Sequence, residues 1–344
     1  MIAVKKHGIL LSPTDHEFEN NGVFNPGIFQ IDNKVHILYR AVQNGNFSTI
    51  GYAKTEGPLQ LIERNQRPLL IPEFDYEKQG IEDPRIVKID STYYITYTAY
   101  DGINAMGAVA TSKDLISFEK LGIVTPRINY RQYAKLVKCC NHSMNPKYHH
   151  FHQLFEQIGL AGEKFRFLRD KDLVLFPRKI NGKFALLHRI WPGIQIVYFE
   201  DWKELTRSFW EDYIKNLSDH IVLDPKDAFE MNYIGAGGPP IETEEGWLLI
   251  YHGVQETTRG RTYHAKAALL NRDNPQIELS RLSTPLFSPS EKWEKEGVVN
   301  NVVFPTGHAV FEGELYLYYG ASDKYTGVVS TPLKELLHYL KKQS

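Results

Sequence analysis

Residues 80–102 read GIEDPRIVKIDSTYYITYTAYDG. Two alternating runs, rich in β-branched and aromatic residues, flank a short polar turn, which is typical of a β-hairpin. The first run begins beside Pro84, and proline is tolerated at the first residue of a strand but not inside a central one. Glu82 and Asp83 stand directly before this proline, and Arg85 follows it. These charges form either an ordinary charged turn or a catalytic acid held on a rigid strand.

Four other stretches repeat this pattern of a proline, a short strand, a polar turn and an aromatic-rich strand. They begin at Phe24, Leu175, Gly237 and Val303. The five repeat prolines are separated by 58, 93, 63 and 65 residues, and they are Pro26, Pro84, Pro177, Pro240 and Pro305. Radial repetition of small antiparallel sheets is typical of a β-propeller. The sequence therefore predicts an all-β fold, a five-bladed β-propeller that forms a single domain over residues 1–344.

One separation is longer than the others because of an additional segment at about residues 127–168. We expect a partly helical insertion there, a surface loop or lid that shapes the substrate entrance or an oligomer contact. The segment contains the adjacent Cys139 and Cys140 and four histidines, His142, His149, His150 and His152. Their spacing matches no standard zinc pattern and neighbouring cysteines rarely pair, so we predict reduced thiols and no metal site. Short helices are also expected within residues 201–216 and at the C-terminal end, residues 331–344.

Composition narrows the classes of function. The chain has 344 residues, 42% of them hydrophobic, and a formal net charge of −1. This balance argues against a nucleic-acid partner, because such proteins usually carry a basic excess or stripe. No apolar run is long enough for a signal-peptide core or a membrane span. We therefore expect a cytoplasmic protein without a membrane partner.

Cationic or proton-carrying side chains recur at one level of the predicted repeat. Counting from the repeat prolines places Arg40, Arg189 and His252 at equivalent positions on the second strand of their repeats. They are candidates for lining one anion-binding pocket, in which buried arginines would need acidic partners or an anionic ligand. The alternative is that each of them ends a strand and faces water, as charged side chains usually do.

Five motifs in order resemble those of glycoside hydrolase family 130. They are NPG in the first repeat, EDPR, KINGKFALLHR, PPIETEEGWLLIYHG, and FPTG followed by LYLYYGASD. The resemblance spans about residues 23–337 apart from the insertion. It implies a five-bladed propeller that cleaves β-mannosides with inversion, by phosphorolysis in most characterised members and by hydrolysis in some.

The resemblance also implies roles for individual residues. The family's catalytic acid corresponds to Asp83 of EDPR. Positions associated with the sugar in the −1 subsite correspond to Asn25, Arg40 and Asp323. Positions that contact phosphate in the phosphorylases correspond to Arg189 and His252. The resemblance implies no cofactor, and inorganic phosphate is the co-substrate if the chain is a phosphorylase.

One position departs from the family pattern. Phosphorylases usually have a lysine directly before IGAG, where this chain has Tyr233. The missing cation weakens phosphate binding and favours hydrolysis, for which Glu211 and Glu230 are candidate bases. Lys171 is a candidate for partial compensation of the lost charge.

The sequence therefore predicts inverting phosphorolysis of an oligosaccharide β-mannoside to mannose 1-phosphate. The alternative is an inverting β-mannosidase, for example one that hydrolyses β-1,2-mannosides. A non-catalytic carbohydrate-binding propeller and a scaffold for protein partners are further alternatives. Assembly into a homo-oligomer is left open.

Three expectations concern the surroundings of the proposed acid. Asp83 must carry a proton at the working pH, so we expect burial to raise its pKa. Arg85 would oppose this if it faced Asp83, so we expect it to point elsewhere, toward Glu82. Four aromatic residues are candidates for stacking on sugar rings, with core packing as the alternative: Tyr97, Tyr100, Trp191 and Tyr251.

Overall fold

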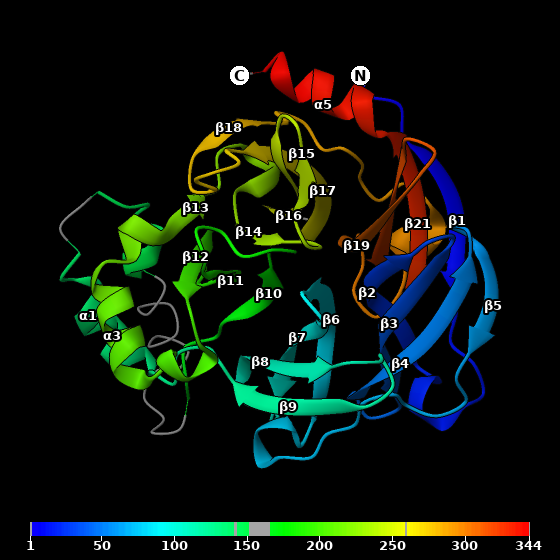
Figure 1. Cartoon of the computed structure of the whole chain (residues 1–344), viewed down its shortest axis with the longest axis horizontal. Helices are drawn as coiled ribbons and strands as arrows, with labels where there is room; N and C mark the ends of the chain where they lie inside the picture. The colour runs from blue at the N-terminus through cyan, green and yellow to red at the C-terminus, as the bar shows by residue number, and fades with distance from the viewer. Residues whose placement is uncertain (1, 141–142, 151–165, 259, 344) are drawn as a thin grey trace.

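The computed structural model describes residues 2–140, 143–150, 166–258 and 260–343. In these residues the fold is all-β with a few short helices, as predicted. The strands form five antiparallel groups, and Figure 1 shows them arranged around a common centre. The first and second groups are joined by one parallel pair, Ser48 with Gly80, and so belong to one eight-stranded sheet.

Each group contains strands that are neighbours in the sequence. The first group has β2 (Gly22–Ile31), β3 (Lys34–Gln43), β4 (Phe47–Glu56) and β5 (Gln60–Arg64). The second has β6 (Gly80–Ile89), β7 (Thr92–Tyr100), β8 (Ala105–Ser112) and β9 (Phe118–Ile123). The third has β10 (Lys171–Leu175), β11 (Phe184–Arg189), β12 (Ile194–Phe199) and β13 (Ile221–Leu223). The fourth has β14 (Tyr233–Ala236), β15 (Ile241–Thr243), β16 (Gly246–Thr257), β17 (Gly260–Leu270) and β18 (Glu278–Arg281).

The fifth group joins the two ends of the chain. It consists of β19 (Val303–Phe311), β20 (Glu314–Ala321), β21 (Tyr325–Pro332) and the first strand of the chain, β1 (Lys5–Leu11). β1 pairs antiparallel with the outer edge of β21. The last group is therefore complete only when the first and last strands of the chain have met.

The helices are short and lie outside the sheets. The α-helices are α1 (Tyr130–Val137), α3 (Arg207–Lys215), α4 (Lys292–Lys295) and α5 (Leu333–Lys341). The 3₁₀ turns are η1 (Glu17–Glu19), η2 (Asp75–Glu77), η3 (Trp202–Glu204), η4 (Leu217–His220) and η5 (Ala228–Glu230). The helices expected within residues 201–216 and at the C-terminal end are thus present. In the described part of the chain, no helix combines the length and the apolar character needed to cross a bilayer.

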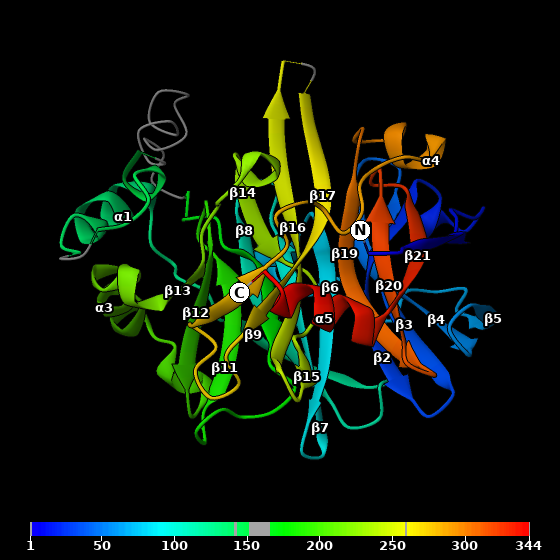
Figure 2. The same ribbon diagram turned by 90° about the horizontal axis from the view of Figure 1, so that it is seen from above.

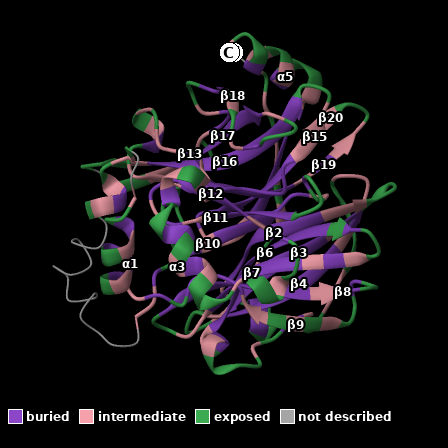
Figure 3. Cartoon of the chain, turned by 60° about the vertical axis from the view of Figure 1, so that its left-hand side comes forward, coloured by how far each residue is buried: buried purple, intermediate pink, exposed green. Residues whose placement is uncertain are grey.

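Apolar packing joins every pair of neighbouring groups. Five clusters of buried apolar side chains each join two neighbouring groups. One of them joins the first group to the fifth, through residues such as Ile37 of β3 and Val328 of β21. Figure 3 shows buried residues running along the strands, with exposed residues gathered in loops and on helices. Burial on both faces explains why these strands contain long apolar runs instead of a simple alternation.

The strands nearest the centre in Figure 1 are β2, β6, β10, β14 and β19. Pro26, Pro84 and Pro305 lie inside these strands and not at their beginnings, which corrects the sequence prediction. Each lies at a β-bulge, where the register of pairing shifts. Pro26 and Pro84 have no register partner at their bulges, so their missing N–H costs no ladder hydrogen bond, whereas Pro305 stands opposite Tyr319 just before its bulge. Pro177 and Pro240 lie between strands.

The bulges give the inner strands of the first three groups a shared backbone feature. Asn25, Asp83 and Asp172 have φ values of 50°, 52° and 56°. Each stands at the register shift of its strand, in β2, β6 and β10 respectively. Asn and Asp tolerate this left-handed conformation better than other residues with a side chain. The third member of the repeat is therefore Asp172 and not Pro177.

A second repeated feature lies in the short helical turns that precede the inner strands. In four groups a fully buried glutamate, from a helical turn just before the inner strand, accepts a hydrogen bond from a tyrosine hydroxyl and pairs with a cation. These Tyr–Glu–cation units are Tyr39–Glu19–Arg64, Tyr97–Glu77–Lys120, Tyr251–Glu230–Lys266 and Tyr319–Glu294–Lys6. The third group has a different arrangement, in which His188 Nδ1 lies 2.8 Å from Asp170 and Nε2 lies 2.8 Å from Tyr213 Oη.

The insertion contributes to the core, contrary to the expectation of a surface loop or lid alone. Its helix α1 buries Tyr133 and Val137 in the cluster between the second and third groups, beside Trp210 and Ile214 of α3. Cys139 and Cys140 are free thiols. His142 and His152 lie outside the described residues. Among the described residues, no cluster of three or more His, Cys, Asp or Glu has an arrangement that could hold a metal ion.

Candidate active site

A cavity of about 150 Å³ is lined by side chains from all five groups. Its lining consists mainly of charged and aromatic residues. The residues are Asn25, Arg40, Asp83, Lys171, Asp172, Arg189, Tyr233, Tyr263, Val299, Val302, Phe304 and Asp323. Five of the sequence-predicted site residues therefore meet here, namely Asn25, Arg40, Asp83, Arg189 and Asp323. Asn25, Asp83 and Asp172 stand at the bulges of β2, β6 and β10, and all three line the cavity.

Asp83 is surrounded by groups that stabilise its charge. Asn25 Nδ2 donates a hydrogen bond of 2.8 Å to Oδ1, and Arg40 Nη1 lies 3.7 Å from the same oxygen. Lys171 Nζ lies 4.0 Å from Oδ2. Burial by itself raises the pKa of Asp83, but Arg40, Lys171, Arg85 and the Asn25 hydrogen bond outweigh burial, so its pKa lies below the ordinary value. The expectation of a raised pKa is thus wrong for the unliganded site.

Arg85 does not pair with Glu82, which corrects a second expectation. Its Nε donates to the carbonyl oxygen of Gly237 at 2.5 Å, and Nη1 donates to the carbonyl oxygen of Asp83 at 2.9 Å. Arg85 therefore ties the bulge of the second group to the fourth group. Glu82 instead binds Arg40 Nη2 at 2.7 Å and Lys171 Nζ at 3.2 Å. It holds these two cations beside the Asp83 carboxylate.

Asp323 is the cavity carboxyl that retains a proton most readily. Burial raises the pKa of Asp323 to about 6, the carboxylates Asp83 and Glu82 add to the shift, and Arg40 opposes it. Asp323 lies in the turn between β20 and β21 and has a φ of 51°. Near neutral pH this cavity therefore contains an ionised carboxylate beside a carboxyl that is partly protonated.

A second charged cluster lies at the third and fourth groups. Arg189 Nε lies 2.6 Å from Asp172 Oδ2, and the guanidinium lies over the ring of Tyr233, 4.7 Å from its centroid. The hydroxyl of Tyr233 is 2.7 Å from that of Tyr263. Tyr233 thus occupies the wall as an aromatic support for Arg189. The Asp172 carboxylate is the residue that counting from prolines missed; the signal that would have found it is an Asn or Asp at the bulge, as in FNPG and EDPR.

His252 lies behind the wall instead of in the cavity. Its side chain is fully buried, with its ring 4.3 Å from that of Phe304, and it is not among the lining residues. Burial lowers the pKa of His252 to about 3, with Arg189 adding to the shift and Asp172 opposing it. Nε2 is 3.8 Å from Asp172 Oδ2. A direct contact between His252 and phosphate is therefore not supported, and a neutral imidazole supplies no positive charge.

Neither candidate base reaches the cavity. Glu211 lies on α3 and pairs with Arg207 at the surface, 2.9 Å away. Glu230 belongs to a Tyr–Glu–cation unit and also accepts from Arg281 Nη1 at 3.1 Å. Both oxygens of Glu230 already have donors, so this carboxylate holds a helical turn in place. The structure provides no support for either residue as a base.

The four aromatic candidates for sugar stacking also lie elsewhere. Tyr97 and Tyr251 are buried in Tyr–Glu–cation units. Tyr100 donates to the carbonyl oxygen of Gly102 in an exposed turn, and Trp191 packs against the cluster under the insertion. The core-packing alternative therefore holds for Tyr97 and Tyr251. The aromatic residues that do line the cavity are Tyr233, Tyr263 and Phe304, and the sequence analysis did not select them for stacking.

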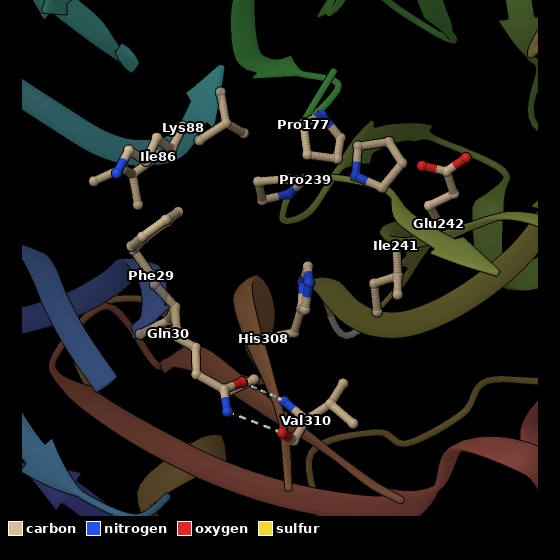
Figure 4. Close-up of a pocket in the computed structure, with 14 residues that line it drawn as sticks. Phe29, Gln30, Ile86, Lys88, Pro177, Pro239, Ile241, Glu242, His308 and Val310 are labelled. Carbon is tan, nitrogen blue, oxygen red and sulfur yellow. Dashed lines mark hydrogen bonds between the residues drawn. The ribbon is translucent and has the colours of Figure 1, made fainter. Parts of the chain in front are cut away.

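A larger cavity, of about 470 Å³, has a different character (Figure 4). It lies between the hairpin ends of the inner strands, and its walls are mainly Pro, Ile, Val and Phe side chains such as Pro239, Ile241 and Phe29. Gln30 is fixed there by two hydrogen bonds to the backbone of Val310. Glu242, the one carboxylate in its lining, is bound by Arg178 and Arg272. Size alone therefore does not identify the site of chemistry, and the smaller charged cavity is the candidate.

Several carboxyl groups around one small cavity are typical of glycoside-cleaving enzymes, which use pairs of Asp or Glu residues. The family model described as beta-1,4-mannooligosaccharide phosphorylase, that of glycoside hydrolase family 130, matches residues 9–164 and 155–342. The chain belongs to glycoside hydrolase family 130, which confirms the resemblance seen in the sequence.

Similar proteins cover nearly the whole chain. A 1,2-beta-oligomannan phosphorylase from Thermoanaerobacter sp. (strain X514) is 32% identical over 340 residues, 95% of this chain and 96% of the relative. A beta-1,2-mannobiose phosphorylase from the same organism is 33% identical over 338 residues, 93% of both chains. The structure of a Listeria innocua beta-1,2-mannobiose phosphorylase with beta-1,2-mannobiose superimposes with a TM-score of 0.73 at 23% identity, over 99% of this chain and 100% of that chain. At this identity the last comparison shows a shared fold.

Proposed function

We propose that this protein cleaves β-mannosides by inverting phosphorolysis, with inorganic phosphate as co-substrate and mannose 1-phosphate as product. The observation that carries the proposal is the single cavity in which the Asp83–Asn25–Arg40 cluster and the Arg189 cluster meet. The phosphorylases that are 32% and 33% identical over almost the whole chain support the same reaction.

Asp83 is the proposed acid. A phosphate oxygen attacks the anomeric carbon, the glycosidic C–O bond breaks, and the leaving oxygen takes a proton from Asp83, directly or through a sugar hydroxyl. In the unliganded cavity Asp83 is ionised because of Arg40 and Lys171. A bound phosphate anion would offset these cations and raise the pKa of Asp83. Phosphate is then both the nucleophile and a condition for acid catalysis.

Asn25, Arg40 and Asp323 are the proposed contacts of the reacting mannose. All three line the cavity around Asp83. Its volume of about 150 Å³ is below the roughly 300 Å³ at which typical ligand pockets begin. It therefore suits one sugar ring, with the remainder of the substrate outside. The β16–β17 hairpin, which contains Tyr263 and extends past the other strands in Figure 2, is placed to border that outer part.

We also propose that the five strand groups are the blades of a five-bladed propeller that forms one domain. The five apolar clusters between neighbouring groups support this arrangement, because the cluster between the fifth and first groups completes the circle. The cavity would then lie on the propeller axis, where inner strands from every blade converge.

Hydrolysis is the second candidate function. It is favoured by Tyr233 at the position of the usual lysine and by the pairing of the three cavity cations with carboxylates. Among the described residues, the remaining cavity carboxyls that could activate water are Asp172 and Asp323. These would replace Glu211 and Glu230 as candidates.

One experiment separates the two functions. The protein is incubated with β-1,2- and β-1,4-mannobiose, with and without phosphate, and products are identified by chromatography and NMR. Phosphorolysis predicts phosphate-dependent formation of α-mannose 1-phosphate. Equal release of free mannose in phosphate-free buffer would establish hydrolysis instead. An inactive preparation of the Asp83→Asn variant serves as the blank for contaminating glycosidases.

A further inference from the structure

The positive charges that line the cavity are already neutralised by carboxylates. Arg40 lies 2.7 Å from Glu82, Lys171 lies 3.2 Å from Glu82, and Arg189 lies 2.6 Å from Asp172. A phosphate that approaches Arg189 thus meets an ion pair instead of a free guanidinium. A divalent anion and an ionised carboxylate on one guanidinium repel each other strongly at low dielectric.

The fold holds Asp172 in a buried position beside Arg189. It stands in the β10 bulge with a φ of 56° and is 4% exposed. Across from it lies Gly235 of β14, where an added Cβ would be 2.3 Å from Asp172 Oδ2 and 2.4 Å from a carbon of the His252 ring. The glycine leaves room for the carboxylate between Arg189 and His252, and no side chain separates them.

We propose that Asp172 determines the protonation state in which this site accepts phosphate: the Asp172 carboxyl and the bound phosphate share one proton while both face Arg189. This inference rests on the proposed phosphorolysis. When phosphate arrives as H₂PO₄⁻ it brings the proton itself. When it arrives as HPO₄²⁻, one proton is taken up from the solvent and is shared by Asp172 and phosphate. No other covalent bond forms or breaks in this binding step. A second phosphate oxygen remains free to attack the anomeric carbon.

The groups around Asp172 supply charge but no alternative proton at neutral pH. Lys171 from its own strand, Arg189 from β11, Arg85 from β6 and His252 from β16 face it, while β14 presents the uncharged Gly235. Burial raises the pKa of Asp172, but the neighbouring cations, Arg189 first among them, outweigh burial, so the carboxyl is ionised. Burial keeps His252 neutral, with a pKa of about 3. The shared proton must therefore come with phosphate or from solvent.

The test is isothermal titration calorimetry of inorganic phosphate into the protein without mannoside. Each titration is made in two buffers that differ in ionisation enthalpy, because the difference in heat gives the number of protons taken up per phosphate bound. At pH 8, where phosphate is mainly divalent, we expect the wild type to take up about one proton. At pH 5.5, where phosphate is mainly monovalent, we expect almost none.

Asp172→Asn is the decisive variant. Its amide donates an N–H where the wild type needs a proton, so at pH 8 we expect uptake of about one proton fewer than in the wild type and at least roughly tenfold tighter phosphate binding. Asp224→Asn is the matched control, because Asp224 bonds Tyr148 Oη at 2.8 Å and does not line the cavity. It should behave like the wild type.

The outcomes separate this inference from the proposed function. Phosphate binding by the wild type at pH 8 without proton uptake would overturn the inference, and so would uptake by Asp172→Asn equal to that of the wild type. If cleavage still requires phosphate in either case, the proposed phosphorolysis stands. If neither form binds phosphate and cleavage needs none, the proposed function fails and the inference fails with it. Should Asp172→Asn not fold, the same titrations of Asp83→Asn decide, because proton uptake in that variant cannot come from Asp83.

Discussion

At the scale of single residues, two carboxyl groups beside Arg40 have opposite pKa shifts. Asp83 is held ionised by three cations and the Asn25 amide, although burial acts the other way. Burial dominates at Asp323 and raises its pKa to about 6. Environments that push neighbouring pKa values apart are typical of acid–base sites. Near neutral pH Asp323 is thus partly protonated while Asp83 is ionised, and the proposed mechanism requires that Asp83 gain a proton before it can protonate the leaving group.

Replacing the proposed acid should abolish cleavage without unfolding the protein. Asp83→Asn keeps the shape of the side chain and a residue type that tolerates a φ of 52°. Loss of a positioned acid commonly lowers the rate by about 10²–10⁴-fold. We expect this loss in kcat on mannobiose, with an unchanged circular dichroism spectrum and melting temperature. Turnover near that of the wild type on this poor leaving group would rule out Asp83 as the acid.

Asp323→Asn should stabilise the unliganded protein in a pH-dependent way. A carboxyl whose pKa is raised by folding favours the folded state when it is protonated, and that contribution is lost as the pH rises from the unfolded pKa, about 4, through the folded pKa of about 6. The amide is neutral at every pH. Relative to the wild type, the free energy of unfolding of the variant should therefore be about 1–3 kcal/mol higher at pH 8 and clearly less so at pH 4.5.

Urea denaturation of both proteins at the two pH values measures this difference. A gain that is equal at pH 4.5 and pH 8 would indicate altered packing and not the titration of Asp323. The same variant should bind mannoside more weakly if Asp323 contacts the sugar, so greater stability would accompany lower activity.

At the scale of elements, the bulges position the residues that line the cavity, and the Tyr–Glu–cation units hold the turns that precede the inner strands. The bulges of β2, β6 and β10 direct Asn25, Asp83 and Asp172 to the cavity. The units fix the helical turns that precede inner strands, as Glu77 does when its Oε2 accepts the backbone N–H of Glu73 at 2.9 Å. A buried carboxylate thus holds a helical turn in one element and lines the cavity in the next, depending on whether its partners leave it open to the cavity.

Breaking one unit should cost far more stability than breaking a surface pair. Glu77→Gln leaves Lys120, 2% exposed in its side chain, without its buried counter-charge, so we expect a loss of about 3–5 kcal/mol in the free energy of unfolding. Glu211→Gln removes only the exposed pair with Arg207 and should cost about 0–1 kcal/mol. Chemical denaturation of both variants makes the comparison. Equal small losses would show that the units are not stabilising.

The elements also show what the sequence allows one to predict. The all-β fold and the helices α3 and α5 follow from local patterns, because alternation, turn residues and helix signals are local. Asp172 was missed because the repeat proline does not keep the same place in each group. Pro84 lies inside the inner strand β6, but Pro177 lies in the loop after the inner strand β10. Glu230 was misassigned because its partners Tyr251 and Arg281 lie 21 and 51 residues away in sequence. The pKa of Asp83 depends on Lys171, whose approach no spacing rule gives.

At the scale of the whole molecule, the two ends of the chain are paired in one group of strands. Lys5 of β1 is paired with Ser330 of β21. The apolar cluster between the first and fifth groups packs beside this junction, through Leu11 and Val328. This pairing joins residues about 325 positions apart, so it closes a very long loop and its closure entropy is correspondingly large. The site depends on the same closure, because Asp323 and Phe304 come from the last group.

A covalent link across this junction should therefore stabilise the protein more than an ordinary local link. Lys5→Cys with Ser330→Cys joins two paired positions and closes a loop of about 325 residues. The chain-entropy estimate for such a loop is on the order of 5 kcal/mol, before any strain is subtracted. Cys139→Ser and Cys140→Ser in the same protein prevent mispairing of the free thiols. The reduced form of this variant is the reference, so side effects of the substitutions cancel. We expect oxidation, verified by mass spectrometry, to raise the urea midpoint and slow unfolding, with the kcat of phosphorolysis unchanged. If the oxidised form unfolds at the urea concentration of the reduced form, closure between β1 and β21 is not what limits the stability of the fold.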